Sequence, residues 1–277
     1  MSRIETRFQS LREHGRKALI PFITAGDPGL HLTVPLMHGL VEAGADIIEL
    51  GVPFSDPIGD GPVIQLANER SLAHGTGLAH VLDMVREFRT RDADTPVVLM
   101  GYLNPIEVMG YQRFADAAAE AGVDGVLTVD QPPEEMGELS GLLASAGLDS
   151  IFLVAPTTTD KRMRIICDHA RGFVYYVSVK GVTGSGNLDV ADIGARVNTI
   201  HSMTGLPVGV GFGISTPEKA AAMSAIADAV VVGSALVNLI KEHAGDDTAV
   251  LREVTRLLRS MRDAVDSQAG QTVSRQA

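Results

Sequence analysis

Eight short apolar runs recur along the chain, with longer amphipathic segments between them. Most runs are aliphatic or β-branched throughout rather than alternating with polar residues, which is typical of parallel strands covered on both faces. The predicted strands are Ala18–Thr24, Asp46–Leu50, Pro96–Gly101, Gly125–Val129, Ser150–Val154, Phe173–Ser178, Pro207–Gly211 and Asp228–Val232. Helical patterns between them include Leu32–Ala43, Leu78–Thr90, Tyr111–Ala121, Glu134–Ala146 and Pro217–Ala225.

Eight successive strand–helix units in a chain of 277 residues predict one α/β domain, a (β/α)8 TIM barrel spanning residues 1–277. A doubly wound open sheet is the alternative, but no Gly-x-Gly-x-x-Gly sequence opens the first predicted helix. Apolar residues at helical spacing predict an extra N-terminal helix through Ile4, Phe8 and Leu11, and a C-terminal helix from Val250 to Val265. The polar segment 266–277 lacks periodicity and is expected to form a frayed tail.

Composition excludes several classes of function. A formal net charge of -11 argues against binding to nucleic acid or to an anionic membrane surface, since both require clustered basic residues. The single cysteine, Cys167, cannot form an intramolecular disulfide and is typical of a reducing compartment. With no signal peptide, no membrane-length apolar run and no metal-binding motif in view, we expect a cytoplasmic protein without a metal site.

The segment 46–62 contains the best candidates for catalysis. Glu49 lies within an apolar predicted strand, where burial disfavours the charged carboxylate and raises its pKa. A loop rich in proline and glycine follows and presents Asp56 and Asp60. A largely neutral acid beside a second acid that stays ionised is a common arrangement for acid–base catalysis, so Glu49 and Asp60 are the catalytic candidates. Asp60 is flanked by glycines, so a role in fixing a turn remains the alternative for it. Asp56 lies beside a proline, so a structural or interface role is preferred for it.

Glycines near the ends of the last strands indicate a phosphate site. Gly211, Gly213, Gly233 and Ser234 leave backbone N–H groups open at the starts of helices, and this fold often binds phosphate after strands seven and eight. Any one of these glycines, taken alone, is better explained by a tight turn; only the glycines taken together favour a phosphate site. Lys180 follows the sixth predicted strand; a Schiff-base role is one hypothesis, and a solvated lid residue is the preferred one.

Several long motifs make the chain resemble the tryptophan synthase α subunit family nearly from end to end. They are residues 20–28 (IPFITAGDP), 49–57 (ELGVPFSDP), 60–62 (DGP), 181–184 (GVTG) and 211–214 (GFGI). The resemblance implies a lyase that cleaves indole-3-glycerol phosphate to indole and glyceraldehyde 3-phosphate for tryptophan biosynthesis. Gly59, where other members have alanine, and the variable stretch around Lys180 affect only the expected loop kinetics.

The resemblance also implies roles for individual residues. Glu49 corresponds to the general acid–base, and Asp60 to the acid that hydrogen-bonds the indole N–H. Thr183 corresponds to a lid residue that closes over Asp60. The indole and glycerol contacts correspond to Phe22, Leu127, Tyr175 and Phe212, and the phosphate contacts to Gly184, Gly213, Gly233 and Ser234.

Membership of this family further implies an allosteric α2β2 heterotetramer with a β subunit that carries pyridoxal phosphate, so no cofactor is expected in this chain. Asp56, Pro57, Asn104 and Pro132 correspond to loops that face the partner. Three alternatives remain: a stand-alone indole-3-glycerol-phosphate lyase, a Schiff-base aldolase using Lys180, and a catalytically inert barrel that only activates a partner.

Overall fold

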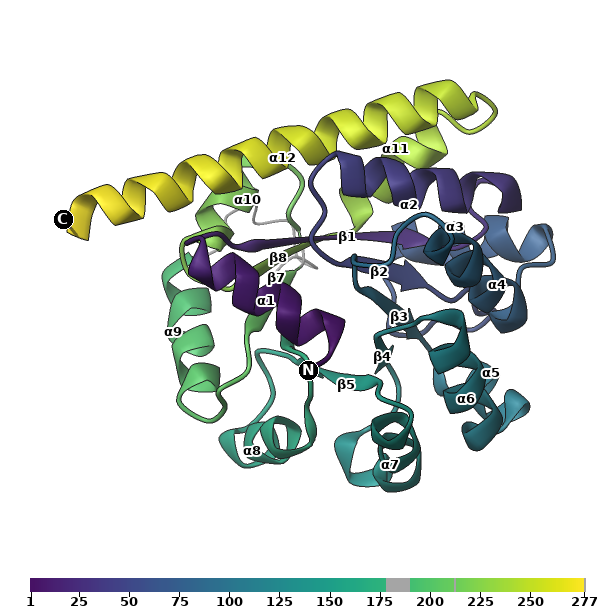
Figure 1. The fold of residues 1–277 in the computed structure, drawn as a ribbon, viewed down its shortest axis with the longest axis horizontal. Helices are drawn as coiled ribbons and strands as arrows, with labels where there is room; N and C mark the ends of the chain where they lie inside the picture. Colours follow the sequence, from purple (N-terminus) through teal and green to yellow (C-terminus); the bar gives the residue numbers. More distant parts are fainter. Residues whose placement is uncertain (178–189, 212, 277) are drawn as a thin grey trace.

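The fold is a closed barrel of parallel strands surrounded by helices (Figure 1). The computed structural model describes residues 1–177, 190–211 and 213–276, with the side chains of 270–276 left out. Within these residues the strands follow one another around the barrel in chain order, from β1 to β8, and β8 closes onto β1. The strands are β1 (Ala18–Thr24), β2 (Ile48–Gly51), β3 (Val97–Gly101), β4 (Gly125–Thr128), β5 (Asp149–Val154), β6 (Val174–Val177), β7 (Val208–Gly211) and β8 (Ala229–Val232).

Helices cover the outside of the barrel and account for the apolar outer faces of the strands. They are α1 (Arg3–Glu13), α2 (Thr33–Glu42), α3 (Pro62–Ala73), α4 (Leu78–Arg89), α5 (Leu103–Met109), α6 (Tyr111–Ala121), α7 (Gly137–Ser145), α8 (Asp160–His169), α9 (Val190–His201), α10 (Pro217–Ser224), α11 (Ser234–Glu242) and α12 (Asp247–Gln276), with short 3-10 turns at Leu30–Leu32 and Pro133–Glu135. None of the helices in these described ranges combines the length and apolar content that a bilayer span needs. The predicted barrel is confirmed, since every predicted strand overlaps an observed one.

The two terminal helices occupy different places on the barrel. Helix α1 begins with the Ser2 side chain accepting a hydrogen bond from the Glu5 N–H, and its apolar face is buried as predicted. Phe8 on that face packs against Phe173, with ring centroids 5.9 Å apart, and so covers the end of the barrel at which the strands begin. Helix α12 lies along α2, α10 and α11 on the outside (Figure 1).

The C-terminal segment differs from the sequence prediction. Residues 266–277 were expected to form a frayed tail, but α12 remains helical to Gln276 and its end extends beyond the barrel (Figure 1). Each residue added to an existing helix gains one backbone hydrogen bond, and the segment contains no proline to interrupt the series. The predicted helix Glu134–Ala146 also differs, since a 3-10 turn at Pro133–Glu135 precedes α7, which starts at Gly137.

A recurring aspartate stabilises the end of the barrel opposite the functional loops. Asp46, Asp124 and Asp228 each precede an even-numbered strand and accept a hydrogen bond from a backbone N–H of the preceding odd-numbered strand. The donors are Leu19, Val97 and Val208, at 2.9, 2.8 and 2.9 Å, and each of these residues also accepts a hydrogen bond from the N–H of its aspartate. Sequence patterning had placed Asp46 and Asp228 inside strands, whereas their side chains serve to tie adjacent strands together.

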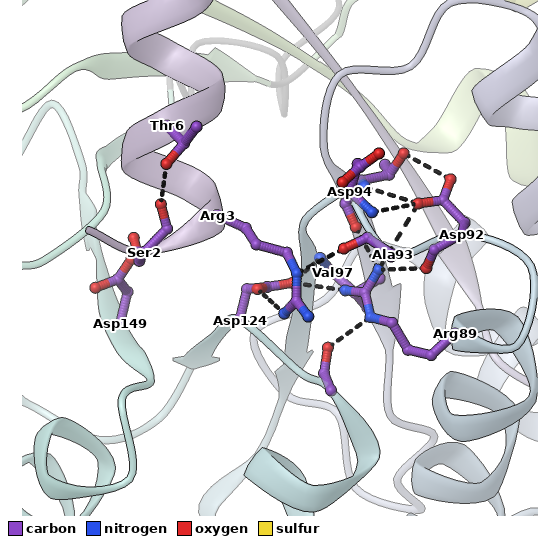
Figure 2. A network of polar contacts seen from close by, with 12 residues as sticks. Ser2, Arg3, Thr6, Arg89, Asp92, Ala93, Asp94, Val97, Asp124 and Asp149 are labelled. Carbon is purple, nitrogen blue, oxygen red and sulfur yellow. Dashed lines mark hydrogen bonds and ion pairs between the residues drawn. The ribbon is translucent and has the colours of Figure 1, made fainter.

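Around Asp124 the ties extend to two helices and one loop (Figure 2). Arg3 of α1 and Arg89 of α4 contact opposite oxygens of the Asp124 carboxylate at 2.8 and 2.7 Å. Asp124 and Arg89 are both largely buried, so the pair is held by close geometry and by additional bonds from Arg89 to backbone carbonyls. Ion pairs of this kind therefore stabilise the end of the barrel at which the strands begin, opposite the loops that carry the candidate site.

Candidate active site

Glu49 projects into the barrel from β2. Successive residues of a strand point to opposite faces, and Glu49 lies in register with Phe22 of β1 and Val98 of β3. Its side chain is only 1% exposed, and its Oε1 atom has no hydrogen-bond partner among the described residues. Burial, together with the negative charge of Asp60, raises the pKa of Glu49 to about 8. The predicted neutral acid is therefore supported by the structure: at pH 7 Glu49 is mostly protonated and able to donate.

Asp60 lies at the end of the loop that follows β2, two residues before α3 begins at Pro62. Burial raises the pKa of Asp60 to about 6, although hydrogen bonds from Asn68 and Tyr102 oppose the rise. The Asn68 amide donates to the Asp60 carboxylate at 3.3 Å, and the Gln65 amide donates to the Asp60 backbone carbonyl at 2.9 Å. Asp60 is therefore mainly ionised at pH 7, as expected, but by a smaller margin than a solvated loop position would give.

Tyr102 is a site residue that sequence reasoning missed. It follows β3, is buried, and stacks on Phe54 with ring centroids 5.2 Å apart. Its hydroxyl accepts a hydrogen bond from the Gly59 N–H at 2.9 Å and is also hydrogen-bonded to the Asp60 carboxylate. Burial and the nearby Asp60 charge raise the pKa of Tyr102 to about 12, so it remains a donor. Its position directly after the predicted strand Pro96–Gly101 was the available signal.

Three predicted pocket residues line the inside of the barrel. Leu127 of β4 and Tyr175 of β6 belong to the same interior cluster, and the pKa of Tyr175 is raised well above its usual value by burial and by the charge of Glu49. Phe22 is buried at the adjoining position on β1. Glycines make room for these rings: a Cβ atom on Gly51 would lie 2.7 Å from Cζ of Phe22, and one on Gly211 would overlap the Tyr175 hydroxyl.

The predicted phosphate residues lie at the ends of β7 and β8. Gly213 is exposed with φ of 71°, a left-handed conformation that favours glycine, and a Cβ added there would meet no atom within 4 Å. Gly233 caps α11, and Ser234 is the first residue of that helix. The unpaired N–H groups at such a helix start suit an anion. Gly184, Thr183, Phe212 and Lys180 lie outside the described residues.

The residues expected to face a partner lie on the segments that follow β2, β3 and β4; Asn104 was expected on a loop but belongs to the first turn of α5. Asp56, Pro57, Asn104 and Pro132 are all exposed or half-exposed. Ile58 and Val108 lie in the same two segments as Asp56 and Asn104, and their side chains are 87% and 81% exposed. Among the described residues, no three His, Cys, Asp or Glu side chains are grouped as a metal ion would require.

Comparison with known proteins agrees with this geometry. The family model described as "Tryptophan synthase alpha chain" matches residues 8–266. Tryptophan synthase alpha chains of Marinobacter nauticus and Thioalkalivibrio sulfidiphilus are each 61% identical to this chain, over 97% and 96% of its length and 100% of theirs. The crystal structure of tryptophan synthase subunit alpha from Legionella pneumophila str. Paris superposes with a TM-score of 0.91 at 49% identity, covering 96% of this chain and 99% of that one.

A more distant relative retains the same fold. One chain of the tryptophan synthase structure from M. tuberculosis in its aminoacrylate-bound form gives a TM-score of 0.85 at 35% identity, with 96% of this chain and 100% of that chain covered. Family model, sequence identity and three-dimensional similarity thus agree over almost the whole chain. The chain belongs to the tryptophan synthase alpha chain family, and it is a lyase of the α reaction, the cleavage of indole-3-glycerol phosphate.

Proposed function

We propose that Glu49 and Asp60 are the catalytic residues of this lyase, with Glu49 as general acid and base and Asp60 as the anion that stabilises the intermediate. The observation that carries the proposal is the buried Glu49 carboxyl, which has an unpartnered oxygen inside the barrel and a pKa of about 8. A carboxyl group of that kind carries a proton at neutral pH and has a free position from which to deliver it.

The reaction needs one proton donor and one proton acceptor at the same place. Protonated Glu49 donates its proton to carbon 3 of the indole ring, which makes that carbon tetrahedral and leaves positive charge on the ring nitrogen. Glu49, now ionised, removes the proton of the glycerol hydroxyl next to the scissile bond. The carbon–carbon bond then breaks, its electron pair returns to the indole ring, and the hydroxyl carbon becomes the aldehyde of glyceraldehyde 3-phosphate.

Asp60 assists the step in which the ring is positively charged. An ionised carboxylate near the indole N–H stabilises that charge by a hydrogen bond that is stronger in the intermediate than in the substrate. Its negative charge also makes Glu49 a stronger base, consistent with the contribution of Asp60 to the raised pKa of Glu49. One acid therefore sets the proton affinity of the other.

The remaining residues bind and orient the substrate. We infer that Phe22, Leu127, Tyr175 and Phe212 contact the indole and glycerol parts, and that Gly184, Gly213, Gly233 and Ser234 contact the phosphate. Phe22 supports this division, since its side chain packs at ordinary contact distance from the position that a Cβ on Gly233 would occupy. Ring and phosphate would thus be held on adjoining strands, β1 and β8. Thr183 is proposed to close over Asp60 once substrate is bound.

The partner is inferred from family membership. Tryptophan synthase alpha chains pair with a β subunit; we infer an α2β2 complex in the cytoplasm, with pyridoxal phosphate in the β subunit and no cofactor in this chain. Exposed Ile58 and Val108 support an interface along the segments of Asp56, Pro57, Asn104 and Pro132, because removing such exposed apolar surface from water is favourable.

Two isosteric substitutions test the catalytic roles. Glu49→Gln and Asp60→Asn should each lower the release of glyceraldehyde 3-phosphate by at least about a hundredfold while leaving substrate binding measurable. Assays with and without a cognate β subunit would distinguish a two-subunit enzyme from a stand-alone lyase by the degree of activation. Turnover retained by Glu49→Gln, or a borohydride-trapped adduct on Lys180, would contradict the proposal.

A further inference from the structure

Helix α3 presents a row of polar side chains to the active site. Gln65, Asn68 and Ser71 are spaced three residues apart, so they lie along one face of the helix. Asn68 and Ser71 are buried, which is unusual for polar residues without a structural or functional task. The first two contact the catalytic loop, and Ser71 donates a hydrogen bond to the Ala25 carbonyl at 2.5 Å.

Helix α3 is fixed in place independently of these contacts. Arg70 forms a bidentate ion pair with the buried Asp27, with both nitrogen–oxygen distances at 2.7 Å, and so ties α3 to the loop after β1. On the apolar side, fully buried Ala67 belongs to a cluster with Phe22 of β1 and Val237 of α11. A helix anchored to two neighbouring elements provides a rigid base for a side chain that must orient another.

The contacts to Asp60 come from two residues of this helix and have different targets. Gln65 donates to the backbone carbonyls of Asp60 at 2.9 Å and Pro57 at 3.4 Å, so it holds the main chain of the loop. Asn68, only 4% exposed, donates its amide N–H to the Asp60 Oδ2 atom at 3.3 Å. A donor aimed at a carboxylate oxygen favours the ionised over the protonated acid.

We propose that Asn68 is a positioning residue of the α reaction, whose buried amide orients the Asp60 carboxylate and keeps it ionised. This inference rests on the proposed role of Asp60. On this view α3 holds the Asp60 carboxylate ionised and in place before substrate binds. The carboxylate then needs no reorganisation when positive charge develops on the indole ring.

Three other groups act on this carboxylate or its neighbours. Glu49 of β2 interacts with it electrostatically, and Tyr102 hydrogen-bonds it from the end of β3. Asp130, from the end of β4, acts on Tyr102. Burial raises the pKa of Asp60 to about 6, against the effects of Asn68 and Tyr102. Removal of the Asn68 amide leaves burial less opposed, so the pKa of Asp60 rises further.

The experiment compares pH profiles of kcat for the unaltered chain, Asn68→Leu, Asn68→Asp and the matched control Glu69→Gln, all assayed with a cognate β subunit. Glu69 is the next residue of α3 and is exposed. In Asn68→Leu, loss of a hydrogen bond to a charged group should move the acidic side of the kcat profile, here called the acid limb, up by about one pH unit. Turnover should then be about fivefold lower near pH 6 and change little near pH 7.5. Asn68→Asp, which keeps the shape but adds a like charge, should move the acid limb further.

Two further measurements separate a failure of this inference from a failure of the proposed role of Asp60. If Asn68→Leu does not fold, as judged by circular dichroism, Asn68→Ala carries the test, because it removes the amide without adding a charge. An acid limb that matches that of Glu69→Gln in every folded Asn68 variant would overturn the inference, even if Asp60→Asn abolishes turnover. Retained turnover in Asp60→Asn would instead reject the proposed role of Asp60 itself.

Discussion

Glu49 and Phe22 are register partners on the neighbouring parallel strands β2 and β1. Because partners in register point to the same face of a sheet, the acid and the aromatic ring both point into the barrel, and both are buried there. The relationship places a proton donor beside an apolar wall. The same wall that suits an indole ring therefore also excludes water from Glu49 and raises its pKa.

Activity should follow a bell-shaped pH profile. The reaction needs Asp60 ionised, which holds above its pKa of about 6, and Glu49 protonated, which holds below its pKa of about 8. Turnover should therefore peak near neutral pH and decline on both sides. The pH profile of kcat should be measured rather than that of kcat/KM, because the phosphate of the free substrate titrates at about pH 6 and affects kcat/KM. A profile that stays flat to pH 9.5 would contradict the assignment of Glu49.

Glu49→Gln should stabilise the fold at alkaline pH. The pKa of Glu49 is about 8 in the folded state and 4.5 when unperturbed, so its contribution is fully present below 4.5 and is lost as pH rises through 8. Glutamine does not titrate, so the gain of the variant should increase with pH to at most about 5 kcal/mol at pH 9. Urea unfolding at pH 5, 7 and 9 measures this, with Glu69→Gln as the control. A gain that does not depend on pH would show that Glu49 is not destabilised by ionisation.

Gly51→Ala should displace the Phe22 ring. The added Cβ would lie 2.7 Å from Cζ of Phe22, closer than packed carbon atoms approach. We expect a loss of about 1–3 kcal/mol in stability and weaker substrate binding, with partial rescue by Phe22→Leu. Gly141→Ala serves as control because no atom lies within 4 Å of its added Cβ. Equal effects of the two alanine substitutions on stability would show that Gly51 is not constrained by the ring.

Asp124→Asn should destabilise the barrel without altering the active site. The substitution removes a buried negative charge that Arg3 and Arg89 contact at 2.8 and 2.7 Å (Figure 2). Leaving Arg89 largely buried without its partner should cost about 3–5 kcal/mol. The exposed pair of Asp83 and Arg86 provides the matched comparison, since Asp83→Asn should change stability by less than about 1 kcal/mol. Turnover of the folded Asp124→Asn fraction at low temperature should equal that of the unaltered chain.

Val108→Asp should weaken the response to the β subunit. Val108 is 81% exposed on α5, so a charge there is solvated in the free chain but would need to be desolvated in an interface. Activation by a cognate β subunit should require at least about tenfold more partner, while turnover without the partner is unchanged. Ala144→Asp on the exposed side of α7 is the control. An unchanged titration would place the interface elsewhere.

The barrel and its main acids were predictable from local pattern. Runs such as Val97–Met100 are apolar on both faces, and the only place for strands of this kind is the interior of an α/β fold. The unfavourable burial of Glu49 in one of them is equally a local property. The end of the barrel at which the strands begin also had a signal in the sequence. Asp46, Asp124 and Asp228 each directly follow an apolar residue and precede a strand. Their shared role was not recognised, since it depends on which strand lies alongside.

Tertiary structure decided what surrounds each acid. Asn68 and Tyr102 belong to α3 and to the end of β3, and nothing in their own neighbourhoods indicates that both bind Asp60. The pKa of Asp60, about 6, results mainly from its burial, which a loop rich in proline and glycine does not reveal. The sequence by itself determined the strands, several of the helices and the two carboxyl groups proposed to react, because periodicity and the cost of burying charge act locally. Only the closed barrel decided their hydrogen-bond partners and proton affinities, because those depend on distances between residues that the chain brings together from separate strands and helices.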